Sequence, residues 1–428
     1  MASRRLQSSC DDSAVFKVSN NLRVDIELTN ELSELLDRQR NEALETLFPP
    51  GASLENILTR LLSTDSMVSS TSTCAAFNQS QRQISAIGYR CIGFGQCGLV
   101  FERPGRAYVV KLAKPAYKEG LWSDFQAHLN VRQAFCRESN PECRVPQLFS
   151  FAPDSSIEWW NENIQFFPDI SDLVPLPTMA LITERILPLP KVVRQALIHQ
   201  YCPPHLQTAA SANPTNRDCL ARLYLGSRRA RPELLSPNFT LRNFNLHLDQ
   251  MLELNLPVFL YAAAMGEAMA IIHWAAHVDG FDIEFVLGSD ANAGTSYNKD
   301  IFLNLDLATE QASCMSSIKD LDAAMRANFK RRTTSMWVLD FNLCHIWRED
   351  CAWENPDGLI SHLVYSFFQN DPYYPRPADQ DLWQKFSAAY RLKADQILAV
   401  PETDQRLVCL PGRFLDACIS HEQGSLLT

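Results

Sequence analysis

The spacing of apolar residues divides the chain into two parts, and the first part has the alternation of β-strands. Apolar and polar positions alternate from Ile84 to Lys114, in the strings SAIGYRCIGFGQCGLVFE and RAYVVKLAK, which the turn Arg103-Pro104-Gly105-Arg106 separates. A period of two around a turn with proline and glycine predicts a β-hairpin. A helix at Leu121–Phe135 and strands at Gln147–Phe151 and Met179–Ile186 complete a β-rich lobe, which we place at residues 81–190.

After Pro188-Leu189-Pro190 the spacing becomes helical. The clearest predicted helices are Lys191–Tyr201 and Leu254–Ala276, and Pro257 is compatible with the second helix because it lies in the first turn. Short strands are predicted at 285–287 and 337–341, and amphipathic helices around Trp353, Phe367, Trp383 and Tyr390 end the chain. We therefore predict an α+β fold with a small β-rich N-lobe and a larger helical C-lobe.

The predicted domains follow from this division. Residues 1–80 form an N-terminal extension, with a helical stretch at Leu32–Leu62 and a Ser/Thr-rich linker at Ser63–Ser80. The N-lobe covers 81–190. The C-lobe covers 191–428 and contains insertions at about 200–245 and 288–335.

Composition narrows the choice of partners and compartment. The net charge is −10, which argues against a protein that coats DNA. Leu256–Val278 is apolar enough to resemble a membrane span, but it contains Glu267 and two histidines, so we expect a buried core helix and no membrane contact. The 13 cysteines form no C-x-x-C pair, which predicts free thiols in the cytoplasm and no structural zinc.

Candidate substrate-binding residues begin in the hairpin. Residues 93–100 read G-F-G-Q-C-G-L-V and fit the pattern G-x-G-x-x-G-x-V, in which Gly93, Gly95 and Gly98 let the backbone approach phosphates. A tight hairpin tip is an equally good explanation of the glycines alone. Lys111 follows on the next strand and would present an ammonium group to this loop, unless it is an edge residue whose charge reaches water.

Two further motifs lie in the C-lobe. His277 and Asp279 fall on the His and Asp of the pattern H-R-D-L-x-x-x-N, with Glu284 in place of the Asn, and Asp340-Phe341-Asn342 falls on D-F-G. Together the four elements resemble those of protein kinases, and this resemblance implies a kinase-like bilobal fold with Lys111 and Asp340 at the substrate site.

The departures from that pattern argue against ordinary protein kinase activity. No glutamate follows Lys111 on the next helix, where the candidate partners are Asp124, Gln126 and His128. The stretch from Asp279 to Asp340 is unusually long, and no A-P-E segment follows it.

The acidic segment Asp279-x-x-Asp282-x-Glu284 is the strongest candidate for chemistry. Three carboxylates so close together repel one another unless a cation lies among them. The segment could hold Mg²⁺, bind a guanidinium or ammonium group, or supply a general base. A solvated acidic turn is the plain alternative.

The strings TERILPLPKVVR, GEAMAIIHWAAHVDGFDIEFVLG and MWVLDFNLC resemble a fungal family with a zinc-finger label, some of whose members are arginine-containing cyclodipeptide synthases. The resemblance implies an enzyme that condenses arginyl-tRNA with a second aminoacyl-tRNA to a cyclo-(Arg-Xaa) diketopiperazine in secondary metabolism. It implies no cofactor and no ATP. It places the acidic motif on Asp279, the expected base, and on Asp282 and Glu284, which would grip the arginine guanidinium or the α-ammonium.

A tRNA partner needs a basic surface, and two groups of arginines interrupt the acidic chain. The other interpretation of these arginines is that they lie on ordinary exposed faces of helices. The candidate tRNA-binding residues are Arg217, Arg222, Arg228, Arg229, Arg231, Arg331 and Arg332.

Three alternatives stay open. Cys97, at the tip of the hairpin, could form an aminoacyl-enzyme, although a packing thiol is the simpler interpretation. The chain could also be a small-molecule kinase that uses ATP and Mg²⁺, or a pseudokinase without activity.

Overall fold

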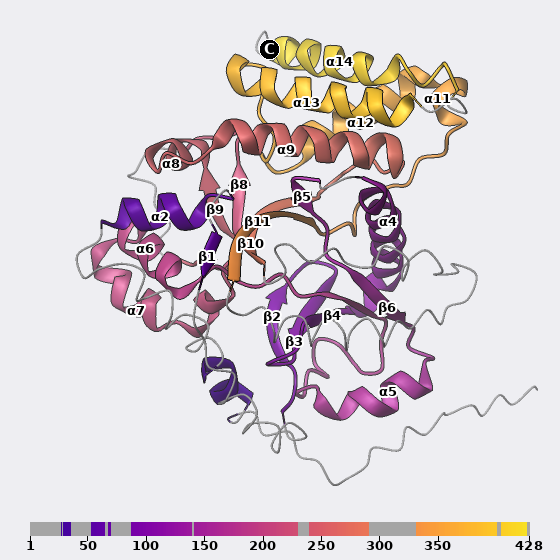
Figure 1. Cartoon of the computed structure of the whole chain (residues 1–428). Coiled ribbons are helices and arrows are strands. Elements are labelled where there is room, and N and C mark those ends of the chain that lie inside the picture. The colour runs from indigo at the N-terminus through magenta and orange to yellow at the C-terminus, as the bar shows by residue number, and fades with distance from the viewer. Residues whose placement is uncertain are drawn as a thin grey trace, which may run out of the picture.

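The computed structural model describes residues 27, 29–35, 53–64, 67–69, 87–138, 141–229, 239–290, 331–399 and 404–425. Two β-sheets lie side by side and helices cover them (Figure 1). The predicted α+β class is confirmed. The predicted stretches 36–52, 230–238 and 291–330, and most of the linker at 63–80, lie outside the described residues.

The first sheet has five antiparallel strands in the order β2-β3-β4-β7-β6. Its successive side chains alternate between two apolar clusters. On β7, for example, Ala180 and Ile182 face one cluster while Leu181 faces the other. The strands are β2 (Arg90–Phe94), β3 (Gly98–Glu102), β4 (Tyr108–Ala113), β6 (Leu148–Ala152) and β7 (Ala180–Glu184).

Each face of this sheet is covered by its own helix. Helix α4 (Lys118–Arg137) brings Leu121, Phe125 and Leu129 onto one face. Helix α5 (Ile157–Asn163) brings the fully buried Trp160 onto the other (Figure 1). Because both faces are covered, packing holds in place the strands β2 and β3, which carry the glycine-rich turn around Gly95.

The second sheet has six strands, and four of them, β8, β9, β10 and β11, lie in the part of the chain predicted to be mainly helical. Its order is β1-β11-β10-β8-β9, and β5 pairs with β11 in parallel. β10 pairs with β11 over seven residues, from Glu284 opposite Leu339 to Asp290 opposite Thr333. The strands are β1 (Met67–Ser69), β5 (Cys143–Arg144), β8 (Ala221–Tyr224), β9 (Phe244–His247), β10 (Glu284–Asp290) and β11 (Arg331–Leu339).

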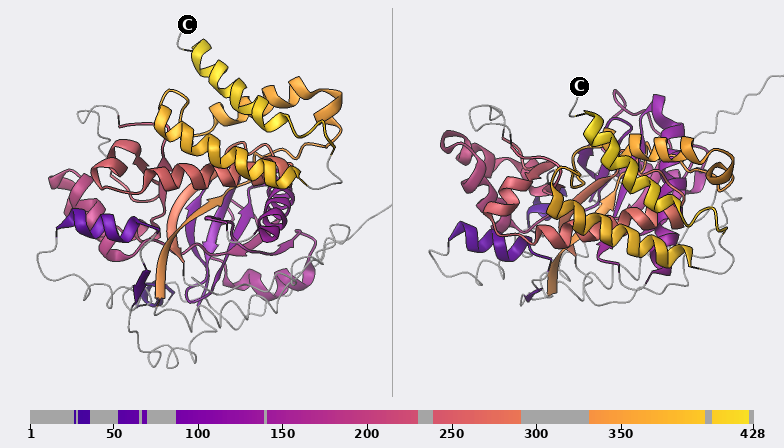
Figure 2. Two further views of the ribbon diagram at one scale, coloured as in Figure 1. Left: turned by 45° about the horizontal axis from the view of Figure 1, so that its top comes forward. Right: turned by 90° about the horizontal axis from the view of Figure 1, so that it is seen from above.

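Helix α9 (Val258–Ala270) forms the centre of the helical layer. It continues as a π-helical turn, Ile271–Ala275, and it lies between the second sheet and α13 (Gln380–Leu398), as Figures 1 and 2 show. Residues 258–275 are the one described helix long and apolar enough to cross a membrane, but 72% of that window is buried inside the protein. A core helix therefore explains its composition.

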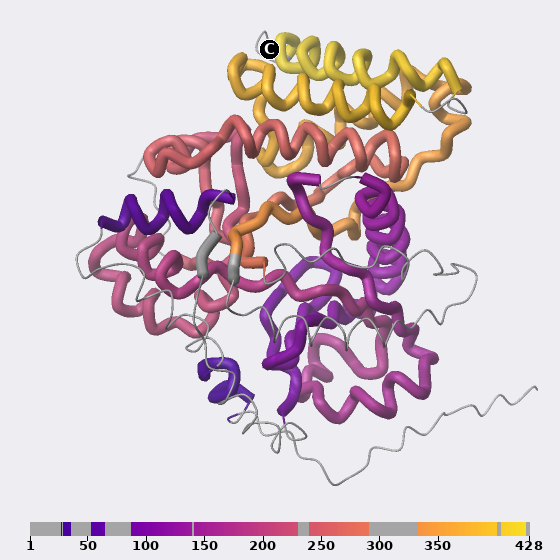
Figure 3. Tube along the Cα trace, in the orientation of Figure 1, coloured from indigo at the N-terminus to yellow at the C-terminus, as the bar shows by residue number. Residues whose placement is uncertain are grey.

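The other helices complete the shell. α2 and α6, far apart in sequence, lie side by side (Figure 3), and Leu58, Leu61 and Leu197 join the same core. The helices of this shell are α2 (Leu54–Leu62), α6 (Lys191–Tyr201), α7 (Gln207–Ala212), α8 (Leu248–Glu253), α11 (Cys351–Glu354), α12 (Pro356–Gln369) and α14 (Leu410–Ser425). Short 3-10 turns lie at Pro115–Tyr117, Ile164–Phe166, Pro204–Leu206 and Pro214–Asp218.

Candidate active site between the two sheets

A cleft of about 460 Å³ lies between the two sheets. This volume is typical of small-molecule sites. Its walls come from the glycine hairpin and β4 on one side, and from β8, the start of β10 and the end of β11 on the other. The cleft brings together most of the residues that the sequence singled out, namely Gly93, Gly95, Cys97, Gly98, Lys111, Arg222, Asp282, Glu284 and Asp340.

Lys111 is held between two carboxylates. Its Nζ lies 2.7 Å from Oδ2 of Asp124 on α4 and 2.7 Å from Oδ1 of Asp340, which follows β11. Burial alone would lower the pKa of Lys111, but the two carboxylates outweigh it and raise the pKa. Among the three partners that the sequence offered, Asp124 is therefore the one that pairs with Lys111, and the lysine is a charged bridge across the cleft.

The glycines of the hairpin are needed for strand packing. A Cβ at Gly98 would lie 2.4 Å from the carbonyl oxygen of Leu112, and a Cβ at Gly93 would lie 2.9 Å from the Cβ of Val100. At Gly95 the nearest atom would be 3.5 Å away, which is ordinary contact. Close strand approach thus accounts for Gly93 and Gly98 before any ligand is considered.

Asp282 and Glu284 form the acidic wall of the cleft. Burial raises the pKa of Glu284 to about 7, against the lowering effect of the Arg222 guanidinium that it accepts. Burial and the nearby carboxylates of Asp340 and Asp371 also raise the pKa of Asp282. Arg222 reaches Asp371 as well, with Nη1 3.3 Å from Oδ2. The wall therefore contains acids that bind protons more tightly than usual, together with one guanidinium.

Asp279 does not share this wall. Its side chain is fully buried and points away from the cleft, toward His345 and His362. Its Oδ1 accepts hydrogen bonds from the backbone N–H groups of Phe281 (3.0 Å) and His345 (2.9 Å). This corrects the expectation that Asp279 is the base, because a carboxylate occupied in this way has no access to a substrate in the cleft.

The turn between these acids explains the separation. Gly280 and Asp282 both have positive φ, of 65° and 62°, so the backbone takes the left-handed conformation twice within three residues. Asp340, across the cleft, has φ 64°. A non-glycine residue pays on the order of 1–2 kcal/mol for this conformation. Such strain in two carboxylate residues that line one cleft is the pattern found at functional sites.

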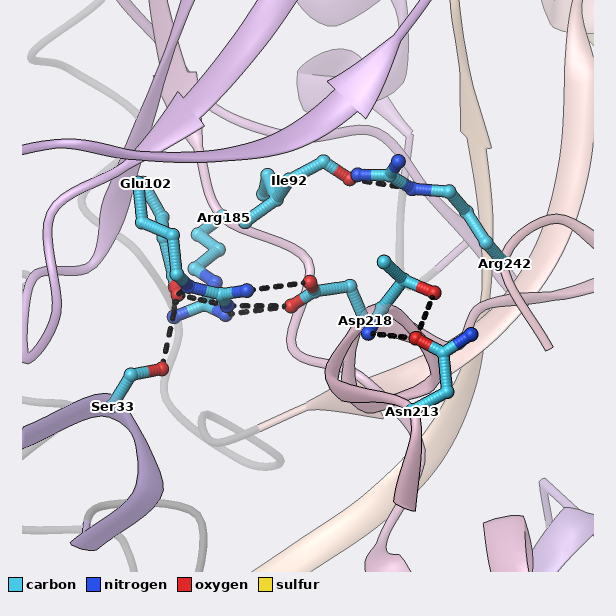
Figure 4. A network of polar contacts seen from close by, with 9 residues as sticks. Ser33, Ile92, Glu102, Arg185, Asn213, Asp218 and Arg242 are labelled. Atoms are coloured by element: carbon cyan, nitrogen blue, oxygen red, sulfur yellow. Dashed lines mark hydrogen bonds and ion pairs between the residues drawn. The ribbon is translucent and has the colours of Figure 1, made fainter. Parts of the chain in front are cut away.

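A buried charge network ties the two sheets together at one end of the cleft (Figure 4). Arg90 on β2 donates to Glu102 on β3 and to both oxygens of Asp218, at 2.9 and 2.8 Å. Arg185 also pairs with Glu102. Nearby, Nε of Arg242, which comes from the loop before β9, donates to the carbonyl of Ile92 at 3.1 Å. Removing one partner from such a network would leave a buried charge unpaired.

The cysteine of the hairpin is a packing residue. Cys97 is 3% exposed, and its Sγ accepts a hydrogen bond from Nδ2 of Asn342 at 2.8 Å. Burial raises the pKa of the thiol, which disfavours the nucleophilic thiolate.

The arginines expected to bind tRNA are paired with the chain's own carboxylates. Arg217 pairs with Glu34, Arg228 with Asp379, and Arg229 with Asp249 and Glu253. Arg222 belongs to the cleft, as described above. Arg231 lies outside the described residues, and for Arg331 and Arg332 only the backbone, in β11, is described. The described arginines therefore do not form an uncompensated basic surface.

Comparison with known protein families gives a match over part of the chain. A profile of a family described as zinc finger protein matches residues 336–402, which is a small part of the chain. No curated protein matches the chain. The matched segment runs from the middle of β11 through α11 and α12 to the end of α13, so it contains Asp340, His345 and His362.

This match corrects three expectations. The resemblance to arginine-containing cyclodipeptide synthases is not supported, because the description of the matching family is zinc finger protein and names no such activity. The expected partners, arginyl-tRNA and a second aminoacyl-tRNA, find no support in it either. The expected absence of structural zinc is contradicted, since the description points to zinc binding.

Proposed function

We propose that the cleft is the active site of an enzyme that joins activated amino acids, at least one of which carries a cationic side chain, and that the product is a cyclic dipeptide containing arginine. The observation that carries this proposal is the pair formed by Glu284 and Arg222. In it, a carboxylate with a pKa of about 7 lies in a small-molecule cleft and already accepts a guanidinium.

The charge of the cleft supports a cationic substrate. Its acidic lining residues outnumber its basic ones, Lys111, Arg185, Arg222 and Arg242. The acids are Asp124, Glu184, Asp218, Asp282, Glu284, Asp340 and Asp371. Burial raises the pKa values of four of them, namely Asp124, Glu184, Asp282 and Glu284. A guanidinium or ammonium that enters would relieve the repulsion among these carboxylates. Arg222 occupies the place that such a group would take next to Glu284.

Glu284 also suits the role of base. An α-ammonium group has a pKa near 8, and a base with a pKa of about 7 is well matched to it at neutral pH. In the proposed step the free amine attacks the carbonyl carbon of an aminoacyl ester. A C–N bond forms, the ester C–O bond breaks, and the proton passes through Glu284 to the departing alkoxide. A second attack of the same kind closes the ring.

The test is a search for the product in cells. The protein is expressed in a heterologous host and extracts are analysed by mass spectrometry for cyclic dipeptides that contain arginine. We expect the product with the wild-type protein and a loss of about 100-fold or more with Glu284→Gln, which is the usual effect of removing a general base. Glu158→Gln, on the exposed side of α5, is the matched control and should leave the yield unchanged.

Either of two results would overturn the proposal. One is an extract indistinguishable from that of cells without the protein, although the protein is soluble and folded. The other is full product from Glu284→Gln.

A second candidate is phosphoryl transfer to a small molecule on a kinase-like bilobal scaffold. It is favoured by Lys111, which lies on the strand after the glycine hairpin and pairs with an acid of α4 and with Asp340. It is disfavoured because Asp279, which falls at the place of the kinase catalytic Asp, faces away from the cleft. Purified protein that releases ADP from Mg-ATP, and loses this activity in Lys111→Met, would favour the second candidate.

A further inference from the structure

A cluster of possible metal ligands lies behind the cleft, on the far side of the acidic segment. Among the described residues it is the one group of three Asp, Glu, His or Cys side chains whose ligand atoms all lie within 4.8 Å of one another. It consists of Asp279, His345 and His362. They come from three separate elements, which are the turn after the π-helix, the loop after β11, and α12.

We propose that Asp279, His345 and His362 bind a zinc ion. Oδ2 of Asp279 lies 3.1 Å from Nδ1 of His345 and 2.8 Å from Nε2 of His362. Two ligands at about 2.1 Å from a tetrahedral zinc ion lie about 3.4 Å apart. Both distances from Oδ2 are thus close to the required spacing, and all three donor atoms lie within 4.8 Å of one another. An outward rotation of the two rings would make room for the ion.

The two carboxylate oxygens of Asp279 have different partners, as expected for a metal ligand. Oδ1 is occupied by the two backbone N–H groups of Phe281 and His345, which fix the orientation of the carboxylate. Oδ2 faces the two imidazole rings. The backbone N–H of Asp279 donates to the carbonyl of His345 at 3.0 Å, so these two ligands are also joined through their main chains. The outer contacts of a metal site normally provide this kind of support.

Exposure of the cluster fits an ion with an open coordination position. The Asp279 side chain is fully buried, whereas those of His345 and His362 are 70% and 44% exposed. The ion would have a buried anionic ligand below and solvent above, which leaves room for a water as fourth ligand. The donor set of two histidines and one carboxylate suits zinc.

The cysteines do not explain the zinc-finger description of the family. Of those in the matched segment, Cys344 is buried and donates to the carbonyl of Phe281, and neither it nor Cys351 belongs to the cluster. Both proposed histidines lie within the matched residues 336–402, while Asp279 lies outside them. The proposed site therefore joins the matched segment to the acidic turn through zinc, without cysteine ligands.

The experiment uses the full-length protein, treated with a chelator and then titrated with Zn²⁺ by calorimetry. We expect one Zn²⁺ per chain, and we expect the affinity to fall on the order of 100-fold in His345→Ala and in His362→Ala. His205→Ala, an exposed histidine on another part of the chain, is the matched control and should bind like the wild type. Circular dichroism checks that each variant is folded.

Substitution with Co²⁺ identifies the ligands independently. Nitrogen and oxygen ligands give the visible bands of tetrahedral Co²⁺ without the intense near-ultraviolet charge transfer that a thiolate produces. A spectrum without this charge transfer would exclude the exposed Cys351 and Cys409 as ligands of the ion. The melting temperature of the wild-type protein should also rise on addition of Zn²⁺, because the ion links three elements of the folded state.

Three results would overturn the proposal: no Zn²⁺ binding by the wild-type protein at tens of micromolar, unchanged affinity in both histidine variants, or a thiolate spectrum with Co²⁺. None of these measurements depends on product formation in the cleft. The zinc site and the proposed enzymatic function can therefore fail separately.

Discussion

The two sides of the short acidic turn 279–284 use the same kind of side chain for opposite purposes. Asp279 lies on the inner side, where backbone N–H groups and histidine rings surround its carboxylate. Asp282 and Glu284 lie on the cleft side, where burial and other acids raise their pKa values. The difference shows that a carboxylate with a complete set of donors serves as an anchor. One that lacks such a set has a raised pKa and is available for chemistry.

The largest effect should come from removing the charge on the inner side. Asp279→Asn replaces an acceptor that faces two histidines with an amide, and we expect the free energy of unfolding to fall by about 2–4 kcal/mol, since hydrogen bonds to charged groups contribute about 1.5–3 kcal/mol each. Urea denaturation in the presence of a chelator measures this without a contribution from metal.

Asp282→Asn is the matched variant on the cleft side. It removes a charge that other acids repel, and asparagine tolerates the positive φ at this position, so the change should be below about 1 kcal/mol. Equal losses in the two variants would contradict the division between the two sides.

An intermediate effect should appear in the pH dependence of stability. Glu184, also in the cleft wall, is 7% exposed, and burial raises its pKa from 4.5 to about 7. The folded state holds this proton where the unfolded state releases it. Its contribution is therefore complete below pH 4.5 and is lost as the pH rises through 7. Relative to the wild type, Glu184→Gln should gain up to about 3 kcal/mol between pH 4.5 and 8.

Urea denaturation of both proteins at several pH values checks this prediction. The difference between them isolates Glu184 from the buried His128 and His273, whose pKa values are lowered to about 4 and whose effect has the opposite sign. A constant difference between wild type and variant across this range would contradict the raised pKa.

The smallest effect concerns the guanidinium in the cleft. Arg222 lowers the pKa of Glu284 against the effect of burial, so Arg222→Gln should move that pKa upward. A carbon-13 NMR titration of the Glu284 carboxyl group measures the change. Arg229→Gln, whose partners are Asp249 and Glu253, is the control and should leave the titration where it is. A downward movement in Arg222→Gln would mean that Arg222 does not act on Glu284.

Much of the fold could be predicted because its signals are local. The hairpin with its turn at Arg103–Arg106 is present as expected, between β3 and β4. The helix Lys191–Tyr201 has the predicted bounds, and the apolar helix after Pro257 is a core helix. In the second sheet, the predicted strands at 285–287 and 337–341 coincide with parts of β10 and β11, but β8 and β9 could not be predicted. β8 and β9 have four residues each and pair in parallel, although 19 residues separate them in the chain. They lie largely within the predicted insertion at about 200–245. Such short strands leave almost no periodic pattern.

The site was predictable in position but not in orientation. Lys111, Asp282, Glu284 and Asp340 meet in one cleft, yet the turn through two residues of positive φ directs Asp279 to the other side. No spacing rule gives that reversal. The histidines near Asp279 are 66 and 83 positions away in the chain, so no motif connects them. Glu284, the partner of Arg222, is 62 positions away, so the sequence predicts an RNA-binding arginine and gives no sign of this ion pair.

The two-residue strand β5 has a consequence for how the chain can be divided. Cys143 and Arg144 belong by sequence to the half that builds the first sheet, but they pair with Met336 and Trp337 in the second. A fragment that began near residue 190 would leave that edge of β11 open to any other extended chain. The halves are therefore unsuited to exchange between proteins as modules, and a split version should reassemble only when both pieces are made together.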